Sequence, residues 1–186
     1  MKRTVCLSLM ALFLIGTASV ASAGKFSIGG FAGLNIPIGQ EDMGNGTLFG
    51  AKGRILLLPF LGVEPNFVFS QYGDKDHTNP ISGETMTREG GDITSFGVDA
   101  VIGTFSGFSK ARFYGILGIN SNTLKWEPHP DQTRLGLSFG AGIEFLPTDV
   151  FGIEVRARVH SISLEGGGGR NNLELTAGLN YYFGPE

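Results

Sequence analysis

Cysteine is almost absent from this chain: a single thiol, at Cys6, occurs in 186 residues. It lies in an N-terminal stretch with the marks of a secretory signal peptide, namely the basic start "MKR", the short apolar run "TVCLSLMALFLIG" and the small-residue triplet "ASA" at 21–23. We therefore predict a signal peptide at 1–23 and a mature domain at 24–186. Since that domain has no cysteine, disulfide bonds contribute nothing to its stability.

Long apolar runs and an excess of positive charge are missing as well. The apolar run of the leader is interrupted by Gly16, and no later segment approaches the ~18 consecutive apolar residues of a membrane-spanning helix. Only 17% of the residues are charged, and the formal net charge is −3. A nucleic acid would require a basic stripe, so we predict no nucleic-acid partner. The length fits one domain.

What the sequence does have is glycine, 30 of 186 residues, and a period of two. The period is clearest in three segments near the C-terminus, 134–145, 151–160 and 172–183. In the first of them, one face carries only the apolar residues Leu135, Leu137, Phe139, Ala141, Ile143 and Phe145. Five earlier segments alternate with more interruptions: 26–34, 49–57, 63–69, 96–102 and 112–120. Because successive side chains of a strand point to opposite faces, the pattern predicts eight strands with antiparallel connections.

One residue conflicts with this pattern. Pro65 lies inside the third predicted strand and has no N–H to donate to a neighbouring strand. We therefore expect either a β-bulge at Pro65 or a position for it at the rim of the sheet.

The two faces of the predicted strands differ in a way that indicates their environment. One face consists of Leu, Ile, Val, Phe and Ala with almost no charge, which suits lipid. The other face is rich in glycine and small residues, and its charges nearly cancel. This suits a crowded interior, where buried charges must be paired. Besides Arg134, the charges expected inside are Lys52, Arg54, Glu64, Asp99, Arg112, Glu144, Glu154, Arg156, Arg158 and Glu174.

These faces predict an all-β fold, an eight-stranded antiparallel up-and-down transmembrane β-barrel that is apolar outside and polar inside. Closure of the barrel leaves no unpaired strand edge in the hydrocarbon. Side chains can just fill the interior of a barrel with eight strands. We therefore expect a packed polar plug rather than a channel.

The connections between the predicted strands alternate in length. Short joints near 58–62, 104–110 and 146–150 alternate with longer polar ones, as periplasmic turns and extracellular loops do in transmembrane barrels. Aromatic residues gather near the short joints and are expected to form a girdle at the membrane interface: Phe60, Phe105, Phe108, Phe113, Phe145, Phe151, Tyr181 and Phe183.

Few residues indicate chemistry. The segment "RVHSISLEGGGGRNN" superficially resembles the lipid A deacylase family, which places a His and a Ser two residues apart on one strand face. Here Ser161 and Ser163 follow His160 at offsets of one and three, and both offsets turn the serine to the opposite face, out of hydrogen-bond reach. His77 and His129 are isolated, and "GGGGR" lacks the Lys-Ser/Thr of a phosphate loop. We predict no catalytic, cofactor or metal site.

The end of the chain carries a family resemblance. "TAGLNYYF" resembles the C-terminal assembly signal of bacterial outer-membrane β-barrel proteins, with Thr176, Gly178, Tyr181 and Phe183 in its slots. Residues 184–186 depart from the family, whose members commonly stop at the closing aromatic. With the leader, the alternating strands and the uneven connections, the chain resembles the small eight-stranded barrels of the OmpA/OmpX type and the generic outer membrane protein β-barrel domain family.

The resemblance implies a function class and partners. It implies a protein of the cell outer membrane that contacts outer-membrane lipid and is read by the barrel-assembly machinery during biogenesis. We expect a structural or surface-interaction role through extracellular loops, with an unknown surface ligand, and no cofactor. Two alternatives stay open, a narrow conduit or binding barrel for a small or hydrophobic molecule and, third, a lipid A-modifying hydrolase.

Overall fold

The structure is a computed structural model, and it describes residues 26–39, 44–78, 85–88, 90–105, 110–125, 131–163 and 169–183. No helix among these residues is long and apolar enough to cross a membrane. The expected signal peptide at 1–23 lies outside the described residues, as does Phe108 of the expected aromatic girdle.

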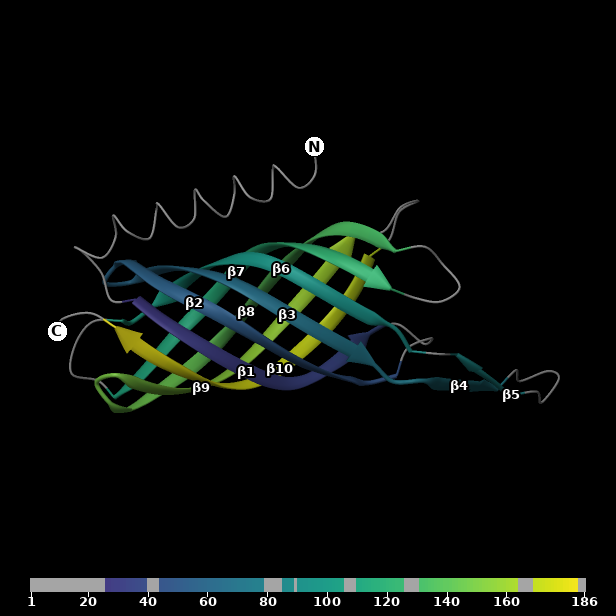
Figure 1. Cartoon of the computed structure of the whole chain (residues 1–186), viewed down its shortest axis with the longest axis horizontal. Coiled ribbons are helices and arrows are strands. Elements are labelled where there is room, and N and C mark those ends of the chain that lie inside the picture. Colours follow the sequence, from purple (N-terminus) through teal and green to yellow (C-terminus); the bar gives the residue numbers. More distant parts are fainter. Residues whose placement is uncertain are drawn as a thin grey trace.

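Eight antiparallel strands close into one barrel, in the order β1-β10-β9-β8-β7-β6-β3-β2. The predicted fold class is confirmed: strands that follow one another in the barrel are neighbours, and the first pairs with the last (Figure 1). The barrel strands are β1 (Phe26–Ile38), β2 (Gly46–Leu58), β3 (Leu61–Tyr72), β6 (Asp92–Gly103), β7 (Ala111–Lys125), β8 (Gln132–Thr148), β9 (Phe151–Ser163) and β10 (Gly169–Phe183).

The two ends of the barrel differ in their connections. We call the end with the connections 59–60, 104–110 and 149–150 the turn end. The other, the loop end, carries the connections 39–45, 73–91, 126–131 and 164–168. The connection 73–91 contains a feature that the period of two did not predict, a small hairpin of β4 (Lys75–Thr78) and β5 (Thr85–Arg88). Figure 1 shows this hairpin projecting beyond the barrel wall.

The pairing register shows that the strands are tilted. A path that steps from each residue to the one opposite it on the next strand does not return to its starting residue. A path of opposite residues that leaves β8 at Ile143 returns to it at Thr133, by way of Val155, Ala177, Ala32, Phe49, Phe69, Thr94 and Thr123. The return point is 10 residues from the start, which is the shear of this barrel. Strand number and shear together fix tilt and diameter, and barrels of this kind tilt by roughly 35–45°.

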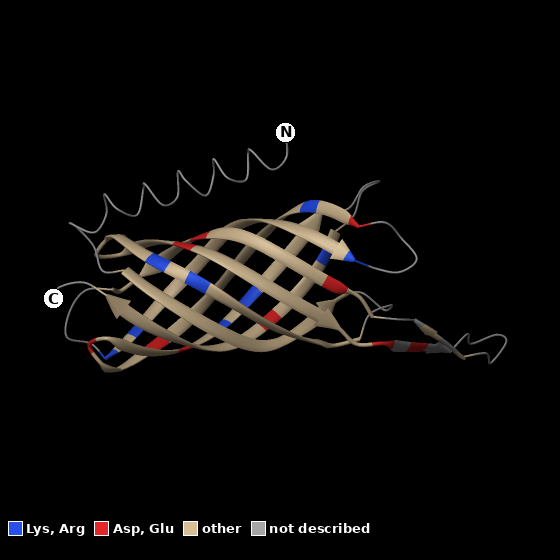
Figure 2. Ribbon diagram, viewed as in Figure 1, with Lys and Arg blue, Asp and Glu red and all other residues tan. Residues whose placement is uncertain are grey.

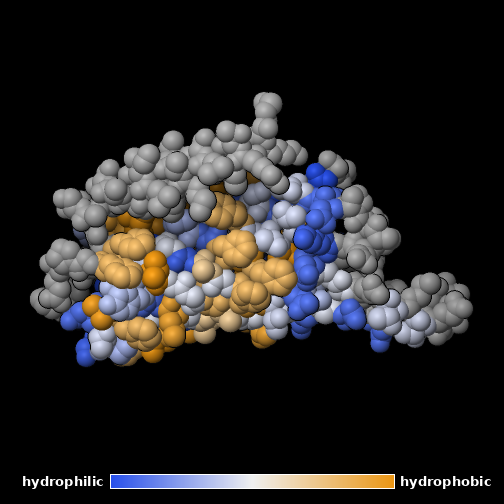
Figure 3. All heavy atoms as spheres, viewed as in Figure 1, coloured by the Kyte–Doolittle hydropathy of each residue, from blue (hydrophilic) through white to orange (hydrophobic). Residues whose placement is uncertain are grey.

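The apolar face points outward, as predicted. In β9, Ile153 and Val155 are 45% and 55% exposed, whereas Glu154 and Arg156 between them are buried. The same alternation runs through the other barrel strands. Apolar side chains cover much of the wall, and a hydrophilic band lies toward the loop end (Figure 3). Along the wall, Lys, Arg, Asp and Glu occupy few positions of the ribbon (Figure 2).

Pro65 is accommodated without the expected β-bulge. Lys52 lies opposite Asn66 and Ile55 lies opposite Val63, so β2 and β3 keep one register on both sides of the proline. Around the proline the ladder lacks only the pairs at Gly53 and Arg54, because Pro65 has no N–H. Both alternatives of the prediction are wrong. The register shift of this strand pair lies nearer the turn, between Leu56 and Leu58, and Pro65 lies within β3, opposite Val98 of β6, rather than at the rim.

The aromatic girdle at the turn end is confirmed except at one described position. Its exposed members are Phe60, Phe113, Phe145, Tyr181 and Phe183, and Phe151 is half-buried. The prediction for Phe105 is wrong, because this side chain is 5% exposed and packs inside the barrel. The cause is the backbone after β6, where the N–H of Phe105 donates to the carbonyl of Pro59 and holds the segment against the β2–β3 turn.

A second row of exposed phenylalanines, which sequence reasoning missed, lies nearer the loop end. Its members are Phe49, Phe67, Phe96 and Phe139. The apolar wall continues beyond this row toward the loop end, where Leu135 and Leu137 of β8 are 75% and 59% exposed.

The outward face generates the first prediction. Val155→Lys places a charge on the apolar belt, in the middle of β9, and should reduce the free energy of unfolding by about 2–4 kcal/mol. Thr176→Ser is the control, because Thr176 points into the barrel and keeps its hydroxyl. Urea titrations in phospholipid vesicles measure both variants. A Val155→Lys protein as stable as the parent would mean that this face contacts water.

Candidate functional site in the barrel interior

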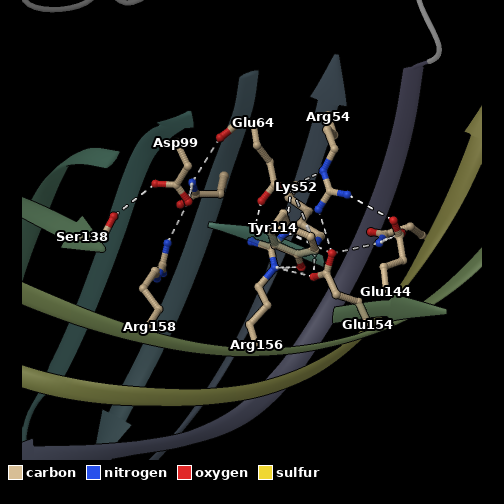
Figure 4. Close-up of polar contacts among 12 residues, drawn as sticks. Lys52, Arg54, Glu64, Asp99, Tyr114, Ser138, Glu144, Glu154, Arg156 and Arg158 are labelled. Atoms are coloured by element: carbon tan, nitrogen blue, oxygen red, sulfur yellow. Dashed lines mark hydrogen bonds and ion pairs between the residues drawn. The ribbon is translucent and has the colours of Figure 1, made fainter. Parts of the chain in front are cut away.

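The ten charged residues expected inside the barrel all lie there, each at most 7% exposed. They come from seven of the eight barrel strands, all except β1. Eight of them are labelled in Figure 4, where their side chains point toward one another. The charged residues of this network are Lys52, Arg54, Glu64, Asp99, Arg112, Glu144, Glu154, Arg156, Arg158 and Glu174. Arg134 is only half-buried, near the loop end, and donates to Gln132.

At the centre of this network, three cations share two carboxylates. Arg156 donates to both oxygens of Glu64, over 2.6 and 2.7 Å, and also binds Glu154. Arg54 spans the same pair, with Nε 2.8 Å from Glu64 Oε2 and Nη2 2.7 Å from Glu154 Oε2. Lys52 adds an ion pair to Glu154 and lies 3.8 Å from Glu64. These contacts cross the lumen and join β9 to β2 and β3, which are far from it in the sequence.

Toward the turn end, Glu144 accepts hydrogen bonds from three donors and has a further cation nearby. Tyr182 donates its hydroxyl over 2.6 Å and Asn180 donates its amide over 2.5 Å. Arg54 donates from 3.3 Å, and Arg112 lies 3.7 Å away. A carboxylate has room for about four donors, and at 3.7 Å Arg112 contributes an ion pair rather than a fourth hydrogen bond.

Toward the loop end, Arg158 links two further carboxylates. Its Nε donates to Glu174 over 2.7 Å and its Nη1 donates to Asp99 over 3.1 Å. Asp99 also accepts hydrogen bonds from Ser138 and Asn66. Each of the five acids in the network therefore has a cationic partner, as burial of charge requires.

His160 belongs to the interior rather than to a hydrolytic pair. It is 3% exposed, with Nδ1 3.1 Å from Glu174 Oε1 and Nε2 2.7 Å from Asn120 Oδ1. The register of β8 against β9 is constant from Gly136 to Phe145, so no bulge turns a neighbouring serine toward the imidazole. Ser161 lies on the opposite face, and the geometry of a lipid A deacylase is not formed at this position.

One aromatic side chain organises the central cations. Tyr114 lies between two guanidinium groups, 4.9 Å from Arg54 and 5.5 Å from Arg156, both measured to the ring centroid. Its hydroxyl accepts a hydrogen bond from Arg156 Nε over 3.0 Å. The ring lies over Gly142 of the next strand, where an added Cβ would come within 2.7 Å of ring carbon Cε2. Glycine at 142 is therefore a requirement of close approach.

Sequence reasoning missed two apolar clusters inside the barrel. One lies toward the loop end and consists of Tyr72, Ile93, Leu124 and Ile162. The other lies beside the central cations and extends toward the turn end, and it consists of Leu56, Val101, Phe105, Tyr114 and Ile116. The alternation along each strand could have placed the strand residues of these clusters on the inward face. Their apolar character suggested the lipid-facing side instead. In the described part of the lumen, one apolar cluster thus lies toward the loop end of the charges, whereas the other lies among them, since Arg112 is nearer the turn end of β7 than Tyr114 and Ile116.

The residues of the expected assembly signal divide between the two faces of β10. Thr176 is 8% exposed and inward, and Gly178 faces β1, where an added Cβ would lie 2.8 Å from the Gly30 carbonyl. Tyr181 and Phe183 are outward, with ring centroids 4.7 Å apart. Phe183 also stacks on Phe26, the first residue of β1, so these aromatics lie on the seam that closes the barrel.

The described residues hold no group of three or more His, Cys, Asp or Glu side chains suited to a metal ion. The carboxylates of the network have organic cations as partners instead.

Comparisons with known proteins agree with this architecture. Residues 5–183 match a family model described as outer membrane protein beta-barrel domain. No curated protein sequence matches the chain.

Among solved structures, three illustrate the likeness. Neisserial surface protein A has a TM-score of 0.65 and 16% identity, over 85% of this chain and 97% of that one. A major outer membrane protein from Thermus thermophilus has a TM-score of 0.59 and 16% identity, over 87% and 100%. Ail of Yersinia pestis, in complex with the heparin analogue sucrose octasulfate, has a TM-score of 0.51 and 20% identity, over 86% and 99%. At these identities the likeness shows the fold.

The network generates the second prediction. Arg156→Ala removes the partner of Glu64 and Glu154 and leaves two buried carboxylates underpaired, so the free energy of unfolding should fall by about 3–5 kcal/mol. Lys125→Ala is the control, because Lys125 is exposed and its 4.0 Å pair with Asp131 is worth only about 0–1 kcal/mol. Urea titrations in detergent micelles compare the two. Equal stabilities would mean that Arg156 is solvated in the folded barrel.

Proposed function

Because this chain belongs to the outer membrane protein β-barrel family, we propose that it is a closed outer-membrane platform that holds its four long connections at the cell surface for interaction with partners. The signal at 1–23 would direct export, and Thr176, Gly178, Tyr181 and Phe183 would be read by the barrel-assembly machinery. Outer-membrane lipid would cover the apolar belt. In this proposal the barrel has no catalytic role, and no cofactor takes part.

The observation that carries this proposal is the packing of the interior. Buried ion pairs bridge the lumen, one apolar cluster lies toward their loop end, and a second packs beside them. A conduit needs a continuous polar path, whereas here the residues Ile162 and Val101, both 0% exposed, are part of the two clusters. The packing therefore favours a plug over the narrow conduit that remains the second candidate.

The charges of the long connections indicate the kind of partner. In the sequence these four segments carry only two basic residues, Lys75 and Arg88. They carry nine acidic residues: Glu41, Asp42, Asp74, Asp76, Glu84, Glu89, Glu127, Asp131 and Glu165. Complementary charge steers association and like charge opposes it. A polyanion such as the sucrose octasulfate seen with Ail is therefore disfavoured for this chain, and a partner with a basic surface is favoured.

The third prediction tests closure of the lumen. Purified protein reconstituted in planar lipid bilayers should show no stable single-channel steps, with a general porin as the positive control. Reproducible steps of uniform size would support the conduit and contradict the plug.

The fourth prediction tests the partner class. The protein in nanodiscs of phosphatidylcholine should bind fluorescent oligolysine. The quadruple variant Glu84→Gln, Glu89→Gln, Glu127→Gln, Glu165→Gln lacks four negative charges and should bind it roughly tenfold more weakly, since an ion pair in water contributes about 0.2–1 kcal/mol. Added salt should weaken binding further.

Asp149→Asn is the control for that experiment, because Asp149 is exposed at the turn end. It should leave oligolysine binding unchanged. Tighter binding of sucrose octasulfate than of oligolysine by the parent protein would overturn the proposed partner class.

A further inference from the structure

Two buried asparagines converge on one tyrosine near the loop end of the lumen. Asn35 of β1 and Asn172 of β10 are each 1% exposed, and Tyr72 of β3 is 4% exposed. Gly46 of β2 lies opposite both Asn35 and Tyr72, and a Cβ there would lie 3.0 Å from the Tyr72 Cα. With no side chain on β2 between them, Tyr72 reaches across that strand to β1.

The amide nitrogens are satisfied at this place, and the amide oxygens are not. Asn35 Nδ2 donates to the Tyr72 hydroxyl oxygen over 2.6 Å, and Asn172 also hydrogen-bonds Tyr72. The Oδ1 atoms of Asn35 and Asn172 are both buried and have no hydrogen-bond partner. Two unsatisfied carbonyl oxygens, those of Asn35 and Asn172, therefore lie near the single hydroxyl group of Tyr72.

A count of donors shows that the shortage does not depend on how the amides are turned. Tyr72 has a single hydroxyl hydrogen, so it can satisfy one carbonyl oxygen and not two. Rotating either amide by 180° exchanges its oxygen and nitrogen, but the other asparagine then keeps an unsatisfied oxygen. Two donors of the neighbouring strand β9, Arg158 and His160, both bind Glu174. Buried polar groups in native proteins nearly always have a partner.

We infer that Asn35, Asn172 and Tyr72 form a binding site for one small hydrogen-bond donor, a water molecule or an ammonium group. Carbonyl oxygens accept hydrogen bonds and repel anions, so phosphate and sulfate do not fit this site. A water molecule and an ammonium ion each have a single heavy atom, which suits a site whose three residues are almost fully buried. Two oxygen acceptors and a hydroxyl are a normal set of partners for a buried water.

The position of the site predicts slow exchange of the bound donor. The apolar cluster of Tyr72, Ile93, Leu124 and Ile162 lies toward the loop end. On the other side, Glu174 and His160 continue the polar layer through Asn120, Asn122 and Ser95. A donor held between an apolar cluster and a complete hydrogen-bond chain leaves only when the barrel fluctuates.

The test is NMR of ¹⁵N-labelled protein in detergent micelles. Cross-relaxation between water protons and the side-chain NH₂ of Asn35 or Asn172 is expected if the donor is water. In a second sample ¹⁵N-ammonium chloride replaces sodium chloride, and a cross-peak to ammonium protons identifies that donor instead. Absence of both cross-peaks in the parent protein overturns the proposal.

Two variants separate the donor site from water elsewhere in the lumen. Asn172→Leu leaves one amide and one hydroxyl that can satisfy each other, so the cross-peak at Asn35 should disappear. Tyr72→Phe removes the internal hydroxyl donor, so the cross-peaks should remain. A cross-peak that persists at Asn35 in the Asn172→Leu variant contradicts the count of donors and acceptors. If Asn172→Leu does not fold, the variant Asn35→Leu replaces it, and the cross-peak is then measured at the side chain of Asn172.

Discussion

Every backbone N–H and C=O of the barrel wall must find its partner within the wall, because hydrocarbon offers none. Closure of β1 against β10 follows from this constraint, and so does the long, uninterrupted ladder of most strand pairs. It also explains how Pro65 is tolerated. The register holds firmly on both sides of the proline, and the cost is confined to the pairs at Gly53 and Arg54. A bulge would have shifted every side chain beyond it to the opposite face.

Once one face of each strand must contact lipid, all polar side chains of the belt are directed inward. Charges placed in a narrow lumen are tolerable only in pairs, and here five acids face five bases, with Glu64 and Glu154 each shared among three cations. The pairs connect residues as far as 102 positions apart, such as Lys52 and Glu154. The network therefore specifies how distant strands face one another across the lumen.

The sequence was sufficient for the strands and their faces, because a period of two survives in residues such as Ile153 to Val159 without knowledge of any partner. It was not sufficient for features that depend on register. The meeting of Arg156 with Glu64, 92 residues apart, follows from the shear and strand pairing, which no local pattern contains. Apolar residues on the inward face, such as Ile162 and Val101, also contradict a simple division into polar and apolar faces. Phe105 was misplaced for the same reason, since composition alone does not reveal where a chain bends after its strand ends.

The balance of charge inside the barrel has a consequence outside it. Because the ten charges of the lumen network are paired at short range, their fields largely cancel beyond the wall. The potential that a partner meets at the loop end is therefore set by the connections, whose acidic residues far outnumber Lys75 and Arg88. Changes in those connections can alter the partner without disturbing a single ion pair of the lumen, since loops on a rigid scaffold vary more freely than packed residues. In the proposed function, the interior fixes the platform and the connections determine what it binds.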